Sequence, residues 1–389
     1  MHTHTRRLRP TLSSLVALLL VALLLLVQAC SDAPQGDGSW LVDAKILVPG
    51  VGAQNHDCRT GVCKHNENCD MTTFDGAIWF VHRTAESQVL GPNSSLRVYR
   101  SDDRGRTFAL QAIIPAVDNR DIRDPSFYQR DGQLFIKAIT RLSGIGLRDT
   151  NVDSISVETH SRDGITWSTP QYVSPVRWGF WRVVEAGGIF YSAAYEDGDL
   201  RVVLYKSSDG LEWEAGAEVY GVSADTPLET ELVVMPSGRM LGLVRMDGTD
   251  TELSGNTRLR TKVCWSLPPY DAWDCPQELE GVRLDGPVAF FWRDRLFVIA
   301  RKHLGADGRK RTALYEITGE LEGGPLGIVE YGEFPSAGDT SYAGVAAIDG
   351  RRFTVTYYSS DIALDEPWVS GLFSGSDIWQ ATIDLSRLP

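Results

Sequence analysis

Charged residues stand at two fixed distances from a turn that recurs along this sequence. Seven positions after the turn residue, three of the repeats have an arginine, at Arg83, Arg245 and Arg301. Seven to nine positions before it stand acids, a fourth arginine and a tyrosine, namely Arg123, Asp124, Glu229, Glu231, Asp285 and Tyr342. A guanidinium fork binds carboxylates and other oxygen-rich groups. Carboxyl groups transfer protons, and a tyrosine beside a carboxylate can act as a nucleophile. The residue types therefore predict a ligand site equipped for acid–base and nucleophilic chemistry.

The turns belong to six copies of one β-hairpin pattern. Each copy has an apolar strand, a tight turn and a second apolar strand, as in ETELVVMPSGRMLGLVR or CDMTTFDGAIWFVHR. The turn residues are separated by 56, 56, 50, 56 and 56 positions and are Gly76, Gly132, Gly188, Gly238, Asp294 and Gly350. A period near fifty residues built from hairpins is typical of a β-propeller. Six copies predict an all-β, six-bladed propeller, and segment 40–48 is expected to close the sixth blade as its last strand.

In a propeller the innermost strands line one central channel, so the two registers are expected to meet at one mouth. Charged residues at strand ends are also often solvated or paired with one another. The coincidence of both registers on one cavity favours a binding site over that simpler explanation.

Three further turns share the pattern of a serine, an aspartate, a glycine and an aromatic residue: SDDRGRTF at 101–108, SRDGITW at 161–167 and SSDGLEW at 207–213. Aspartate accepts backbone N–H groups in such a turn, and glycine supplies a positive φ. These turns resemble the Asp-boxes of sialidase-type propellers. The resemblance implies a six-bladed β-propeller of sialidase type, with Asp103, Asp163 and Asp209 in structural roles on the outer rim.

The candidate site also resembles that of sialidases. Glu229 and Arg245 match a glutamate and an arginine of the family's fourth blade, and Tyr342 matches its tyrosine nucleophile. The resemblance implies that Tyr342 is the nucleophile and Glu229 its base, with arginines clamping the sugar. We expect Asp124 to be the acid, although it follows the first Asp-box whereas the acid of the family precedes it. The chain departs from the family where the first carboxylate-binding arginine is expected, because it has HNEN at 65–68 there.

A second resemblance keeps another mechanism open. Arg123-Asp124-Pro125 is similar to a motif of five-bladed fructan and arabinan hydrolases, which implies paired carboxylates such as Asp124 with Glu229 or Glu231. Three aromatic residues of the third blade, Trp178, Phe180 and Trp181, can stack on a sugar or pack in the core.

The N-terminus predicts export. Arginines precede a short apolar run at 15–27, and the following LVQAC resembles a bacterial lipobox that ends at Cys30. We expect a signal peptide at 1–29, a lipidated tether at 30–39 and the propeller at 40–389, anchored to the outer membrane through Cys30. Loss of the three signal arginines changes the formal net charge from −13 to −16. Such acidity, with no basic run, argues against nucleic-acid partners.

Five cysteines remain after Cys30. An exported chain favours disulfides, and Cys264 with Cys275 flank a turn-rich insert that one bridge can staple. Cys58, Cys63 and Cys69 leave one member over, and together with His65 they offer a metal site as the lesser alternative.

These observations predict an exported lipoprotein, expected to be monomeric and without cofactor or metal, that acts as a sialidase-like exo-glycosidase on terminal sugars of glycans. The alternative is a non-catalytic propeller lipoprotein that binds a glycan or a protein.

Overall fold

The computed structural model describes residues 40–89, 91–142, 154–196, 201–221, 225–247, 258–305 and 307–389. The expected signal peptide, Cys30 and tether lie outside these ranges. Within them, no helix has the length and apolar character needed to cross a membrane.

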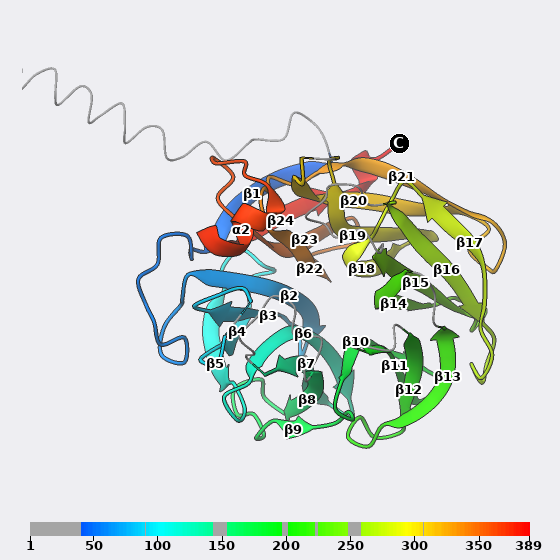
Figure 1. The fold of residues 1–389 in the computed structure, drawn as a ribbon, viewed down its shortest axis with the longest axis horizontal. Coiled ribbons are helices and arrows are strands. Elements are labelled where there is room, and N and C mark those ends of the chain that lie inside the picture. Colours follow the sequence, from blue (N-terminus) through cyan, green and yellow to red (C-terminus); the bar gives the residue numbers. More distant parts are fainter. Residues whose placement is uncertain are drawn as a thin grey trace, which may run out of the picture.

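The described chain is a ring of antiparallel sheets around a central axis (Figure 1). Two sheets come from single runs of the chain in the middle of the sequence, one made of β14 (Thr226–Val234), β15 (Met240–Asp247), β16 (Arg260–Ser266) and β17 (Asp274–Glu280), the other of β18 (Asp285–Trp292), β19 (Arg295–His303), β20 (Lys310–Gly319) and β21 (Leu326–Glu333). A third comprises β2 (His65–Phe74), β3 (Ala77–Ala85), β4 (Ser95–Ser101) and β5 (Ala109–Pro115).

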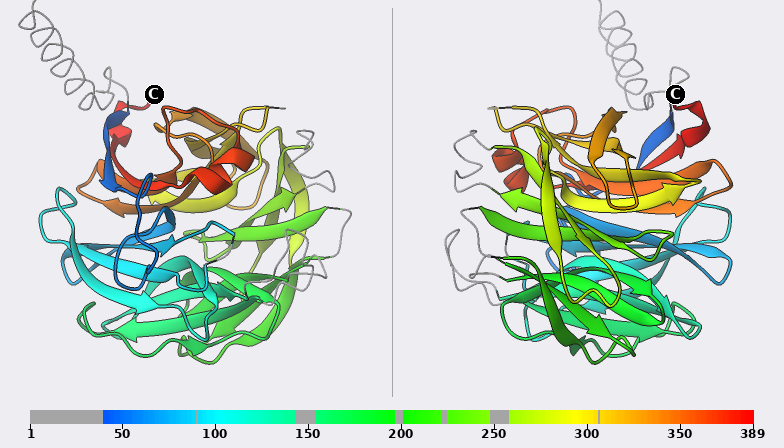
Figure 2. Two further views of the ribbon diagram at one scale, coloured as in Figure 1. Left: turned by 60° about the vertical axis from the view of Figure 1, so that its left-hand side comes forward. Right: turned by 90° about the vertical axis from the view of Figure 1, so that its right-hand side faces the viewer.

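The ring closes by pairing the two ends of the described chain. Strand β1 (Leu41–Val48) adds to β24 (Asp377–Asp384), which continues through β23 (Arg352–Ser359) to β22 (Thr340–Ala347). Ala44 pairs with Ala381, and Figure 2 shows β1 beside the C-terminal strand. The prediction that segment 40–48 closes the last sheet is therefore confirmed. A short helix, α2 (Trp368–Ser374), and a 3₁₀ turn (Leu385–Arg387) flank β24 in the sequence.

The expectation of six separate blades is wrong. Four sheets stand alone as four-stranded blades, whereas the remaining strands form one eight-stranded sheet: β6 (Asp121–Arg130), β7 (Gln133–Arg141), β8 (Ser154–Ser161), β9 (Gln171–Tyr172), β10 (Trp178–Ala186), β11 (Ile189–Glu196), β12 (Val202–Ser207) and β13 (Glu214–Tyr220). The cause is the two-residue length of β9, which leaves part of the β8 edge open. Trp178 pairs there with Ile155 in parallel fashion, and Arg177 N–H donates to the Ser154 carbonyl. The unpaired N–H and C=O groups of an open strand edge form hydrogen bonds with a neighbouring backbone segment.

All six predicted hairpins are present, and apolar side chains pack between neighbouring sheets. The turn pairs are, for example, Phe74 with Ala77 and Trp292 with Arg295. One core cluster joins Leu243 of β15 to Val298 of β19, both fully buried. The three serine–aspartate turns share one hydrogen-bond pattern, as where Asp163 Oδ1 accepts from the backbone N–H of Thr166 at 2.8 Å.

Disulfides join Cys264 to Cys275, as predicted, and Cys58 to Cys63, while Cys69 is free and buried. The metal alternative loses two of its four residues to the Cys58–Cys63 bridge. Among the described residues, no group of three or more His, Cys, Asp or Glu side chains is arranged to hold a metal ion.

Candidate functional site

The innermost strand of every repeat carries an irregularity at the same place, just before its pairing with the next strand becomes regular. The shifts in register lie between the following pairs: Glu67/Cys69 in β2, Arg123/Ser126 in β6, Phe180/Val183 in β10, Pro227/Thr230 in β14, Asp285/Val288 in β18 and Ser341/Gly344 in β22. A bulge bends its strand and re-aims a side chain. The residues inside these six bulges form the candidate site.

Four bulge residues adopt the left-handed conformation: Asn68 at φ 50°, Asp124 at φ 50°, Tyr342 at φ 49° and Gly286 at φ 56°. Such values are uncommon for residues other than glycine, and they concentrate where the surrounding structure imposes them. Gly286 lies directly against the aromatic ring of Tyr342, and a Cβ at this position would be only 2.7 Å from the Tyr342 Cγ. This close approach explains why a glycine stands here.

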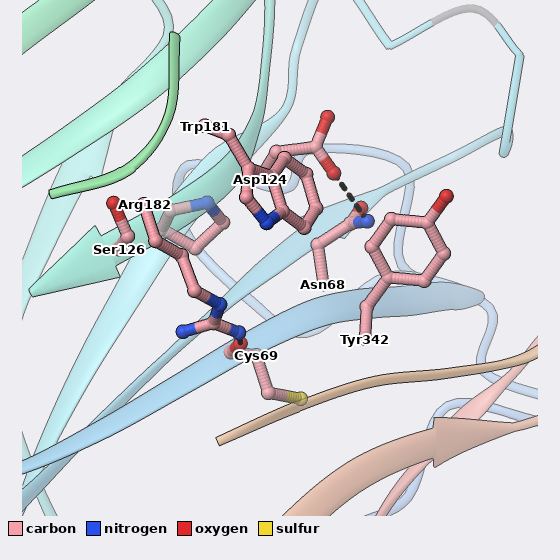
Figure 3. Close-up of a pocket in the computed structure, with 8 residues that line it drawn as sticks. Asn68, Cys69, Asp124, Ser126, Trp181, Arg182 and Tyr342 are labelled. Carbon is pink, nitrogen blue, oxygen red and sulfur yellow. Dashed lines mark hydrogen bonds between the residues drawn. The ribbon is translucent and has the colours of Figure 1, made fainter. Parts of the chain in front are cut away.

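The bulges surround a small hollow (Figure 3), lined by Asn68, Cys69, Asp124, Pro125, Ser126, Trp181, Arg182 and Tyr342. Asn68 Nδ2 donates to Asp124 Oδ1 at 2.6 Å. The rings of Trp181 and Tyr342 meet edge to face with centroids 6.0 Å apart. The sequence predicts Tyr342 and Asp124 for this site and allows Trp181 either to stack on a sugar or to pack in the core. It does not predict Asn68, Ser126 or Arg182.

Tyr342 and Glu229 are hydrogen-bonded across the mouth. The Tyr342 hydroxyl donates to Glu229 Oε1 at 2.5 Å. The other oxygen of Glu229 accepts from Arg245 Nη1 at 2.7 Å and from the backbone N–H of Gly286 at 2.9 Å. Arg245 Nη1 also reaches the Tyr342 oxygen at 3.1 Å. The phenol thus has a base on one side and a cation beside its oxygen.

The surroundings raise the pKa of both the phenol and the acid of the site. Burial, and then the neighbouring Glu229 carboxylate, raise the pKa of Tyr342 well above its ordinary value of 10. Burial also raises the pKa of Asp124, an effect that Arg123 opposes and Glu229 reinforces. A tyrosine in this state becomes a nucleophile only when its proton leaves during the attack.

Arg301 and Arg83, which stand at the same position of the repeat as Arg245, form ion pairs with carboxylates. Arg301 lies with its guanidinium 5.1 Å from the centre of the Tyr342 ring and donates to Asp339 at 2.7 Å. Asp285 is fully buried behind the mouth, where it accepts from Arg283 at 2.7 Å and lies 3.3 Å from Arg245 Nε.

Arg83 and Arg123 lie farther round the ring. Arg83 is fully buried and bonds Asp121 through Nε and Nη2, each at 2.9 Å. The Arg123 guanidinium lies 3.7 Å from Asp121 and also 3.7 Å from Asp124. Neither arginine lines the hollow, although Arg123 lies beside Asp124, which does line it.

One arginine that lines the hollow contacts several inner strands of the ring. Arg182, on β10, donates to Asp70 of β2 at 2.5 Å, to the Ala343 carbonyl of β22 at 2.6 Å and to the Pro287 carbonyl of β18 at 3.3 Å. In Figure 3 its guanidinium points away from the Asp124 carboxyl and toward Cys69.

Two acids extend this contact to the remaining inner strands. Asp70 accepts from the backbone N–H of Phe127 on β6 at 2.6 Å. Glu231 of β14 lies 3.8 Å from Arg182 Nε and accepts from the backbone N–H of Ala289 on β18 at 2.8 Å. Asp70, Arg182 and Glu231, here called the hub, thereby join the inner strands of all six repeats. No pattern in the sequence singled out Asp70 or Arg182.

We expect Glu231→Gln to flatten the pH dependence of stability. Burial raises the pKa of Glu231 to about 7, against the opposing charge of Arg182. Because the folded state holds this proton more tightly than the unfolded chain, the stabilisation is full below about pH 4.5 and is lost as the pH rises through about 7. The variant should therefore gain up to about 3 kcal/mol over the parent between pH 5 and pH 8.

Urea denaturation of both proteins at the two pH values measures this gain. The exposed Glu214→Gln serves as the control and should leave the pH dependence of the parent in place. Parallel pH profiles for Glu231→Gln and the parent would contradict the assignment.

Comparison with solved structures reveals the same fold in sugar-processing enzymes. NanB sialidase of Streptococcus pneumoniae superposes with a TM-score of 0.61 at 12% identity, covering 88% of this chain and 71% of NanB. The intramolecular trans-sialidase of Ruminococcus gnavus, solved with oseltamivir carboxylate, gives 0.61 at 11% identity, covering 89% and 98%. The chain has a sialidase-type β-propeller fold.

The same fold comparison also reaches an α-L-arabinanase of Penicillium chrysogenum, solved with arabinobiose, at a TM-score of 0.57 and 16% identity, covering 83% of this chain and 94% of that one. No protein-family model and no curated protein matches the sequence. At these identities the likeness shows the propeller alone, so the chemistry has to be argued from the site.

Proposed function

We propose that this protein is a sialidase-like exo-glycosidase that hydrolyses terminal sugars of glycans. The observation that carries the proposal is the 2.5 Å hydrogen bond from the Tyr342 hydroxyl to Glu229, beside a hollow that Asp124 also lines. A base within hydrogen-bond reach of the nucleophile and an acid in the same hollow are the parts that glycoside hydrolysis needs.

The first step of the proposed reaction transfers the sugar to Tyr342. The phenol oxygen forms a bond to the anomeric carbon while Glu229 takes its proton, and the bond from that carbon to the leaving oxygen breaks. Asp124 gives its proton to the leaving oxygen, which its burial-raised pKa prepares it to do. Arg245, 3.1 Å from the Tyr342 oxygen, stabilises the negative charge that develops there.

The second step releases the sugar. Water attacks the same carbon, its proton passes to Asp124, and the bond from the carbon to the tyrosine oxygen breaks. The proton held by Glu229 returns to the phenol. Two displacements on one carbon retain its configuration, and Tyr342, Glu229 and Asp124 all regain their starting protonation.

Hydrolysis of fluorogenic and alkyl glycosides by the parent and by Asp124→Asn tests the proposal. The parent should hydrolyse at least one terminal glycoside. Because Asp124 protonates the leaving oxygen, its loss should slow an alkyl glycoside by about 10²-fold or more and an aryl glycoside, whose leaving group needs less help, by less. Folded parent protein that hydrolyses no glycoside of the panel would contradict the proposal and favour the non-catalytic glycan-binding alternative.

The export predicted from residues 1–30 is part of the proposal. A lipid on Cys30 would anchor the propeller to the outer membrane, where the enzyme would act on glycans. The LVQAC sequence supports this anchor.

A further inference from the structure

The arginines that recur in the repeats have little capacity left for a ligand. Arg83 donates Nε and Nη2 to Asp121 and Nη1 to Glu67, at 2.8 to 2.9 Å. Such a bidentate pair uses the fork that would otherwise hold a carboxylate. Arg83 is also fully buried.

Arg245, the arginine nearest to Tyr342, is engaged in the same way. Its Nε and Nη2 bond the two oxygens of Asp247 at 2.7 and 2.9 Å, and its Nη1 bonds Glu229 at 2.7 Å. A substrate carboxylate would have to displace one of these acids or share the arginine with it. Both arrangements bring like charges together in a buried place, which is costly.

Arg301 completes the set. Its Nη2 bonds Asp339 at 2.7 Å and the Tyr358 hydroxyl at 2.8 Å, and its Nε donates to the Thr340 carbonyl at 2.8 Å. Arg182, which lines the hollow, is held by Asp70 and by three backbone carbonyls. In the part of the chain that the structure describes, these four arginines are thus each matched by acceptors of the protein itself.

The lining of the hollow offers an acceptor instead. Asn68 is 4% exposed, and its Oδ1 is buried without a hydrogen-bond partner, while its Nδ2 is used by Asp124. A buried acceptor that lacks a partner is costly unless a ligand donates to it. A sugar hydroxyl can donate such a hydrogen bond, whereas a carboxylate can only accept. Trp181 also lines the hollow, and an aromatic ring suits the apolar face of a sugar.

We propose that the site takes an uncharged terminal sugar, and that Asn68 Oδ1 accepts one of its hydroxyls. The expected hydrolysis of such a sugar rests on the proposed glycosidase function, whereas its expected binding does not. The proposal departs from the sugar-clamping role expected for Arg83, Arg245 and Arg301 and makes Asn68 a specificity-determining residue.

Hydrolysis and binding are measured separately to test the substrate class. The purified full chain is given 4-methylumbelliferyl glycosides of galactose, L-fucose, L-arabinofuranose, glucuronic acid and N-acetylneuraminic acid. Saturation-transfer NMR then reports binding of the five free sugars. At least one neutral sugar should be hydrolysed or bound, with kcat/KM or affinity about 100-fold above that of either acid.

Asn68→Gly removes the acceptor and keeps the left-handed backbone that glycine tolerates. It should weaken affinity for the neutral sugar about tenfold, since a hydrogen bond to a buried acceptor is lost. Asn55→Gly is the matched control, because Asn55 lies outside the hollow and bonds the Asp57 carbonyl. It should leave affinity unchanged.

The outcomes separate the two proposals. Comparable hydrolysis or binding of a carboxylated sugar would overturn the inference while leaving the glycosidase function in place. Binding of a neutral sugar without any hydrolysis would support the inference and contradict the enzyme. Absence of binding by any neutral sugar, or equal losses in Asn68→Gly and Asn55→Gly, would overturn the inference.

Discussion

Tyr342→Phe should reduce kcat on a hydrolysed glycoside by about 10³-fold or more, because the substitution deletes the proposed nucleophilic oxygen and nothing else. The fold should tolerate it. Glu229 keeps its hydrogen bonds from Arg245 and from the backbone N–H of Gly286, so no buried carboxylate is left alone. Loss of one buried hydroxyl contact costs about 1 kcal/mol. Steady-state kinetics beside thermal unfolding separates the catalytic loss from any structural one.

Tyr358→Phe is the matched control for this experiment. Its ring lies 6.0 Å from that of Tyr342, and its hydroxyl contacts Arg301 rather than the base. We expect the kcat of Tyr358→Phe to stay within about tenfold of the parent value, because the variant loses only one hydrogen bond. If Tyr342→Phe retains activity while Asp124→Asn and Glu229→Gln lose it, the mechanism is the paired-carboxylate one that Arg123-Asp124-Pro125 suggested.

Arg182→Met should lower the free energy of unfolding by about 3–5 kcal/mol, the usual cost of leaving buried charges without their partner. Asp70 and Glu231 are 5% and 4% exposed, so water cannot replace the guanidinium. The carbonyls of Ala343 and Pro287 lose a donor as well. Denaturation followed by tryptophan fluorescence measures the change.

Arg295→Met provides the comparison. Arg295 pairs with Glu316 on the rim, at 2.6 Å, with its side chain 25% exposed, and such partly exposed pairs contribute about 1 kcal/mol or less. Arg182→Lys should recover only part of the loss, since an ammonium group cannot reach three strands in the planar geometry of a guanidinium. Equal effects of Arg182→Met and Arg295→Met would mean that the hub is not a stabilising unit.

Local structure could be predicted from the sequence wherever a short stretch of residues determines it. The hairpin turns at Gly76, Gly132 and their equivalents, the closing strand at 40–48 and the Cys264–Cys275 bridge all follow from patterns within a few residues or from one period. The proximity of Glu229 and Tyr342, 113 positions apart, was also predictable, because both stand at one register of a repeat that forms a ring.

The partners of the charged groups were decided by the tertiary structure alone. Arg83 meets Asp121, which is 38 positions away in the next repeat, and Arg182 meets Asp70 across the channel, 112 positions away. The register shows that an arginine faces the mouth, but an ion pair depends on which acid the folded ring brings within a few ångströms. The bulges are also invisible in the sequence, since a bulge is a mismatch between two strands and not a property of either. For the same reason the period of the hairpins determined a propeller from the sequence alone, while the joining of β8 to β10, and the commitment of each arginine fork, appeared only when the strands were placed side by side.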